Sequence, residues 1–171
     1  VQWWYPQHGN PAPRKKHLTF FVGSSEVNKR WFPERWVEII RQLSSRYMDE
    51  QIVVVTGISN PEQEELMYIR RSVKHIPNVL VSNPKNIDGS LNILKGSKLL
   101  VSHDSYPIHL ASLLHMPVLG IYFSTDPIIW GSYENINYSF IASSLSCGGE
   151  KLGTGNCSHF HTSCPNIREI K

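Results

Sequence analysis

The sequence predicts an α/β domain built on a doubly wound parallel sheet. Short apolar segments of strand length alternate along the chain with longer segments whose apolar residues recur at helical spacing. The two clearest apolar runs are followed closely by a glycine, as strands that end in tight turns often are. The chain has 171 residues, of which 40% are hydrophobic and 18% charged, so it is long enough to bury one core of ordinary composition.

The first half of the chain contains two strand–helix units. A strand is predicted at residues 18–22, and a helix follows at 33–47, opened by a proline suited to a first turn. The second strand, at residues 52–55, is β-branched throughout. A second helix begins at Pro61, with acidic residues near its start and basic residues near its end, as the helix dipole favours.

The second half repeats the same alternation. Strands are predicted at 78–81, 98–102 and 117–123, with helices at 87–96 and 106–115 between them. Five strands and four helices in alternation form the βαβ pattern, and right-handed crossovers make the sheet Rossmann-like and doubly wound. Beyond Trp130 the pattern weakens, and residues 138–142 are a further candidate strand.

We expect three regions: a linker or leader at 1–17, the Rossmann-like domain at 18–145, and at 146–171 a Cys-rich loop with the start of a C-terminal helix. The chain has no initiator Met, and residues 167–171 resemble the first turns of a helix, so we interpret it as part of a longer protein. The net charge of +3 is too small to indicate nucleic-acid binding. No apolar run reaches the roughly 20 residues of a membrane span, and no signal-peptide pattern is present.

In such sheets ligands bind where the strands' carboxyl ends lead into helices. After the first strand stand Gly23-Ser24-Ser25 and then Lys29-Arg30. A glycine turn, hydroxyls and backbone amides can hold phosphate oxygens, and the cations supply the charge that a diphosphate needs. The alternative is a plain polar turn whose cations face water. There is neither a GxxxxGK[ST] P-loop nor the GxGxxG of a nicotinamide-binding dehydrogenase.

Two further loops lie at the same predicted edge. After the fourth strand, Asp104 or Ser105 can cap the next helix, and His109 lies one turn further on, where it could meet an anion at the helix N-terminus. Asp104 would repel a diphosphate, so a role beyond capping would be to accept hydrogen bonds from sugar hydroxyls. After the fifth strand, residues 124–127 form a turn by composition, and Trp130-Gly131 follow.

These three loops, in this order, resemble the motifs of glycosyltransferase family 9, the ADP-heptose:lipopolysaccharide heptosyltransferases, which have the two-domain GT-B fold. The resemblance is to the C-terminal, donor-binding domain and covers roughly residues 18–135. The family's PGSS and KRWP, its NDSGPMHLAA, and its PTDP and WGPY are matched here by the following segments: Val22-Gly23-Ser24-Ser25, Lys29-Arg30-Trp31-Phe32-Pro33, His103-Asp104-Ser105-Tyr106-Pro107-Ile108-His109-Leu110-Ala111, Ser124-Thr125-Asp126-Pro127 and Trp130-Gly131-Ser132-Tyr133.

The resemblance implies a role for each matched position. Lys29 and Asp104 are the expected catalytic residues, and either Glu62 or Glu64 would bind the donor's ribose. The remaining donor-binding residues are expected from the same loops: Gly23, Ser24, Ser25, Thr56, Gly57, Ser105, Tyr106, His109, Thr125 and Asp126.

The resemblance also implies a reaction. A sugar passes from a nucleotide-sugar co-substrate, expected to be ADP-linked, to lipopolysaccharide core or another surface glycan. Displacement is direct, with no metal and no other cofactor. The base that activates the acceptor is expected in an N-terminal domain that this chain lacks, so the chain alone should bind donor without catalysing transfer. A cytoplasmic location at the inner face of the inner membrane, with peripheral membrane association, also follows from the resemblance.

The chain departs from the family pattern at two places that matter. Tyr106 stands where the family keeps glycine, and Phe123-Ser124 replace Gly-Pro, so both changes are expected to put bulk near the donor. A different sugar or nucleotide, or weakened activity, would follow. The alternative functions are a degenerate glycosyltransferase domain kept as a binding or scaffold module, and another GT-B-like enzyme such as a sugar-nucleotide epimerase.

Cys147, Cys157 and Cys164 resemble the Cys-rich segment of many family members. With His159 and His161 between them, a zinc site is one interpretation and a disulfide another. Because the spacing matches no common zinc module, we expect reduced thiols in a packed loop.

Overall fold

The computed structural model describes residues 16–132, 135 and 137–142, which form the predicted α/β domain. Its parallel sheet has six strands in the order β3-β2-β1-β4-β5-β6. The strands are β1 (His17–Phe21), β2 (Gln51–Val55), β3 (Val79–Ser82), β4 (Ser97–His103), β5 (Val118–Tyr122) and β6 (Tyr138–Ala142). The prediction of a Rossmann-like doubly wound sheet is therefore confirmed, and the candidate strand after Trp130 is the sixth strand.

The helices are α1 (Pro33–Arg46), α2 (Asn60–Val73), α3 (Ile87–Lys95) and α4 (Tyr106–Leu113). Two short elements were not predicted: the 3₁₀ turn η1 (Val27–Lys29) and the single-turn helix α5 (Pro127–Trp130). Elements of three and four residues are too short to show a hydrophobic period. His17, which the sequence places in the leader, pairs with Gln51 and Ser97 as the first residue of β1.

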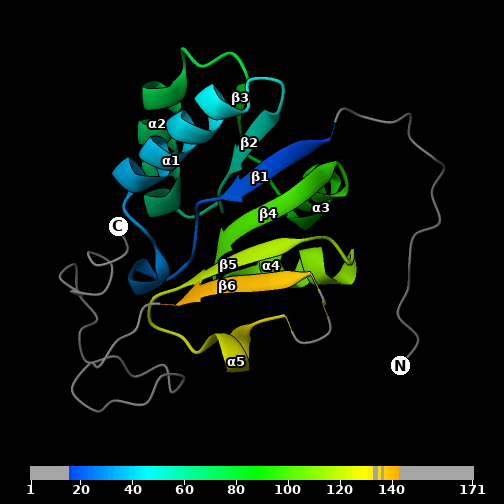
Figure 1. Cartoon of the computed structure of the whole chain (residues 1–171). Helices are drawn as coiled ribbons and strands as arrows, with labels where there is room; N and C mark the ends of the chain where they lie inside the picture. The colour runs from blue at the N-terminus through cyan, green and yellow to red at the C-terminus, as the bar shows by residue number, and fades with distance from the viewer. Residues whose placement is uncertain (1–15, 133–134, 136, 143–171) are drawn as a thin grey trace.

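Two layers of helix cover the sheet, and Figure 1 shows α1 and α2 together on one side with α3 and α4 behind β4 and β5. Neighbouring strand residues point to opposite layers, as the period of two requires. Phe20 and Val54 pack in the cluster that contains Trp36 of α1, whereas Phe21 belongs to the cluster that contains Ile108 of α4.

The strand order places a topological switch between β1 and β4. These strands are neighbours, but β1 leads into α1 on one face and β4 into α4 on the other. The loops that follow them therefore diverge at the carboxyl ends of the strands, where such sheets bind ligands. The next two loops at this edge follow β2 and β5.

Residues 1–15 of the leader, the three cysteines with their histidines, and the expected C-terminal helix lie outside the described residues. The proposed region boundaries therefore stay predictions. Within the described part of the chain, no helix is long and apolar enough to cross a membrane.

Candidate functional site

Three loops meet at the carboxylate of Asp104, directly after β4. Nζ of Lys29, from the loop after β1, lies 3.0 Å from Oδ2 of Asp104. Oγ1 of Thr125, from the loop after β5, donates a hydrogen bond of 2.7 Å to the same oxygen. Asp104 is 6% exposed. The convergence of the three predicted loops is thus a direct contact between side chains.

Lys29 is held as a cation at this point. It ends the 3₁₀ turn η1, and its backbone N–H donates to the carbonyl of Glu26. Burial alone lowers the pKa of Lys29, but the hydrogen bond and charge of Asp104, together with Glu26, outweigh burial and raise the pKa above its ordinary value. Nζ also lies 5.9 Å from the ring centroid of Trp130, the last residue of α5. The site therefore contains a fixed positive charge beside a buried carboxylate.

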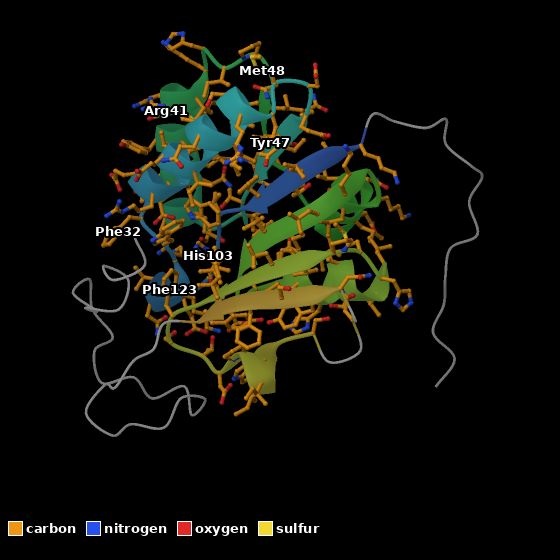
Figure 2. All side chains as sticks on the ribbon, in the orientation of Figure 1. Phe32, Arg41, Tyr47, Met48, His103 and Phe123 are labelled. Atoms are coloured by element: carbon orange, nitrogen blue, oxygen red, sulfur yellow. The ribbon has the colours of Figure 1, made fainter. Side chains whose placement is uncertain are left out.

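His103, the residue before Asp104, fixes the loop that contains Lys29. Its Nε2 accepts a hydrogen bond of 2.8 Å from the backbone N–H of Trp31. Burial lowers the pKa of His103 to about 3, so the ring is neutral and can act as acceptor. The ring packs edge-on against Trp36 and beside Phe123. Figure 2 labels His103 and Phe123, which lie together at the carboxyl end of the sheet.

The expectation for Arg30 is wrong in one respect. Its guanidinium does not stand free to meet a diphosphate, because Nη1 donates to Glu65 of α2 at 2.9 Å and the side chain is buried. Burial raises the pKa of Glu65, while the charge of Arg30 opposes that rise. Arg30 therefore ties the β1 loop to α2, and Lys29 is the cation that the motif presents beside Asp104. We call the solvent-facing side of Lys29, Asp104 and Thr125 the opening.

Of the two acidic residues that could bind ribose, only Glu62 lies at this edge. It is buried and forms the capping box of α2, where its Oε2 accepts from the backbone N–H and hydroxyl of Ser59. Glu64 is exposed on the outer side of α2, beside Met67 and Arg71.

Glu62 also explains two glycines at the predicted site. A Cβ added at Gly23 would collide with Oε1 of Glu62 and Oγ1 of Thr56, and a Cβ at Gly57 would collide with the Glu62 carboxylate. Thr56 is buried, and its hydroxyl has no partner among the described residues. The glycines therefore make room for a buried carboxylate.

The residues around the start of α4 are placed differently from one another. Ser105 is the N-cap residue of α4, although its side chain makes no capping hydrogen bond. Tyr106 is 39% exposed, its hydroxyl lies 2.8 Å from Oγ of Ser90, and its ring packs edge-on against Phe21. His109 is exposed on α4, and no contact joins it to Lys29 or Asp104 in the described structure.

The predicted bulk at Phe123 is not found at the opening, because Phe123 is 1% exposed and packs in the core. In the same loop, Asp126 caps α5 by accepting from the backbone N–H of Ile128 at 2.8 Å. Ser24 is buried in the β1 loop, whereas Ser25 is exposed. The site thus gathers Lys29, Asp104 and Thr125, with the other predicted residues around them.

Sequence reasoning assigned no role to two residues of this site. His103 begins the segment that matches the family's NDSGPMHLAA, and its position as the last residue of a strand could have indicated a role at the site. Glu26, three residues before Lys29, lies 3.3 Å from the Lys29 ammonium. Among the described residues, no group of three or more His, Cys, Asp or Glu side chains is arranged to hold a metal ion.

Comparison with known proteins adds an independent line of evidence. The model of glycosyltransferase family 9 (heptosyltransferase) matches residues 5–153. Lipopolysaccharide heptosyltransferase 1 of Escherichia coli (strain K12) is 28% identical over 123 residues, which are 72% of this chain and 37% of that protein. Lipopolysaccharide core heptosyltransferase OpsX of Haemophilus influenzae is 23% identical over 125 residues, which are 72% of this chain and 35% of that protein.

Solved structures agree with the sequence comparison. The structure of E. coli heptosyltransferase WaaC with ADP has a TM-score of 0.66 at 25% identity. The match covers 78% of this chain and 39% of the WaaC chain. The structure of E. coli ADP-heptose lps heptosyltransferase II has a TM-score of 0.63 at 19% identity, covering 76% and 39%. The chain spans little more than a third of the length of these proteins.

Proposed function

This chain belongs to glycosyltransferase family 9, and from its site we propose that it binds the nucleotide-sugar donor of a sugar-transferring enzyme. The observation that carries the proposal is the Lys29–Asp104–Thr125 contact at the switch point of the sheet. A related structure in complex with ADP supports ADP as the nucleotide, and one with ADP-2-deoxy-2-fluoro heptose supports a heptose-like sugar.

In this proposal Lys29 acts on the leaving group. Displacement at the anomeric carbon leaves negative charge on the nucleoside diphosphate, and a fixed ammonium beside it stabilises that charge more strongly in the transition state than in the bound donor. The positive end of the α4 dipole, at Ser105 and Tyr106, adds to the same effect. Ser25, which is exposed in the same loop as Lys29, and the buried Ser24 beside it are the proposed hydroxyl donors to the phosphates.

Asp104 has two roles in the proposal. Its Oδ2 receives both Lys29 and Thr125, so it positions the ammonium. Its other oxygen, Oδ1, is the acceptor proposed for a hydroxyl of the transferred sugar. At the same edge of the sheet, after β2, Oε1 of Glu62 is the acceptor proposed for the donor's ribose.

The activation of the acceptor is assigned elsewhere. We place the base, and the contacts to lipopolysaccharide or another glycan, in a part of the protein outside this chain. The chain by itself is then a donor-binding domain, and its reaction needs no metal or further cofactor.

Titration calorimetry of the chain with ADP, UDP, GDP and their sugars tests the proposal. We expect ADP and ADP-heptose to bind, and both to bind more tightly than UDP or GDP. The alternative is a scaffold module whose donor site is blocked, and Tyr106, in place of the family's glycine, is the observation that favours it. Folded protein that binds none of these ligands would support the scaffold and refute donor binding.

A further inference from the structure

The Lys29 ammonium contacts two carboxylates of very different character. Asp104 is buried, lies 3.0 Å away and also receives Thr125. Glu26 lies 3.3 Å from Nζ, but its side chain is 46% exposed. One carboxylate is thus built into the site, whereas the other reaches it from solvent.

The charges at the site oppose the ligand that the proposed function assigns to it. Arg30 is paired with Glu65, so Lys29 is the cation of the β1 motif that is left beside the Asp104 and Glu26 carboxylates. A diphosphate brings at least two negative charges, and Glu26 would lie within a few ångströms of them. The Glu26 carboxylate therefore contacts, together with Asp104, the same ammonium that a phosphate oxygen would have to contact.

We propose that Glu26 is an internal competitor for the donor's diphosphate, holding Lys29 until the phosphates displace it. The inference rests on the proposed function, since it names a control on the same site. Asp104 cannot take this part because it is buried and bonded to Thr125. Glu26 can, because its carboxylate is the exposed partner of the pair: solvent weakens its attraction for Lys29, and a rotation about its side chain moves it into water.

The competitor makes the site selective for highly charged ligands. The attraction of a singly charged ligand for the Lys29 ammonium is no stronger than that of the Glu26 carboxylate. A diphosphate carries more charge, so its attraction for Lys29 is strong enough to displace Glu26. Donor affinity is therefore lower than Lys29 alone would allow, and it depends on ionic strength, because both the pair and the repulsion are exposed to salt.

The test is titration of ADP into the full chain and into the variant Glu26→Gln, which keeps shape and removes charge. We expect Glu26→Gln to bind ADP about three- to tenfold more tightly at low salt, the scale of one charge contact near a protein surface, and the gain to shrink at 0.5 M salt. The control is Glu38→Gln, which removes an exposed carboxylate from the Arg35–Glu38 pair on α1, also spaced i,i+3, and should leave ADP affinity unchanged.

Two outcomes would overturn the competitor while leaving donor binding in place. Equal affinity in Glu26→Gln and the unmodified chain would make Glu26 a surface ion pair only. Weaker binding in Glu26→Gln would make Glu26 a ligand of the donor. Absence of ADP binding in both folded proteins would instead refute the proposed function, and the competitor with it.

Discussion

Lys29 and Asp104 form an ion pair of 3.0 Å between two loops that leave neighbouring strands toward opposite faces of the sheet. The pair joins the loops on the two sides of the switch point between β1 and β4, and Thr125 adds the loop after β5. A cation in this position serves two functions at once, since it neutralises a buried carboxylate and presents charge to a ligand. Substitutions at the pair and around it should separate these functions.

Lys29→Ala should weaken ADP binding by about 1.5–3 kcal/mol, the range for a hydrogen bond to a charged group. The physical reason is that no other free cation of the β1 motif faces the opening, because Arg30 is bound to Glu65. Calorimetric titration measures the loss. Lys98→Ala is the matched control, because Lys98 pairs with Glu50 at the opposite end of the sheet and its loss should leave ADP binding unchanged. An unchanged affinity in Lys29→Ala would remove Lys29 from the phosphate site.

Thr125→Val should lower the free energy of unfolding by about 1.5–3 kcal/mol. Valine has nearly the shape of threonine, but it leaves the buried Asp104 carboxylate without the hydrogen bond from the Thr125 hydroxyl. The neighbouring Ser124→Ala is the control: the Ser124 hydroxyl is buried with no partner in the described structure, so its removal should be neutral or stabilising. Urea denaturation of the three proteins gives the comparison. Equal losses at both positions would mean that the Thr125–Asp104 bond does not stabilise the fold.

Much of this architecture could be predicted from local patterns. The β-branched run at residues 52–55 is β2 with one residue added, and the parallel sheet follows from the alternation of strands and helices. Because the carboxyl ends of parallel strands share one edge, the meeting of the three loops was predictable as well.

The partners within that edge were not predictable, since they depend on contacts between distant segments. Arg30 turns to Glu65 of α2 rather than to the opening, and His103 accepts from the backbone of Trp31. Phe123 packs in the core instead of crowding the donor. No spacing within one loop determines which neighbouring helix a side chain will meet.

Gly23→Ala should destabilise the protein by about 1–3 kcal/mol, the cost of forcing a side chain into a well-packed region. The added Cβ would collide with the carboxylate of Glu62, the hydroxyl of Thr56 and the backbone nitrogen of Gly57. Glu62 is fixed by Ser59 in the capping box and cannot withdraw easily. Thermal or urea unfolding measures the effect. A substitution without cost would contradict the interpretation that Gly23 makes room for Glu62 and would return its role to close approach of a ligand.

His103 should make the fold sensitive to acid between pH 6.5 and about 3. Its pKa is about 3 in the folded protein because the ring is buried, whereas an unfolded histidine has a pKa near 6.5. Between these values the unfolded chain binds one more proton than the native protein, so stability is full above the unfolded pKa and falls as the pH falls. From pH 7 to pH 5 this single group should lower the free energy of unfolding by about 2 kcal/mol.

His103→Gln keeps an acceptor for the Trp31 N–H without a titrating ring. In urea titrations, the free energy of unfolding of this variant should therefore fall by about 2 kcal/mol less than that of the unmodified protein over the same pH interval. Parallel losses in the two proteins would show that His103 is able to charge in the native state, and that the acceptor role assigned to its neutral ring is wrong.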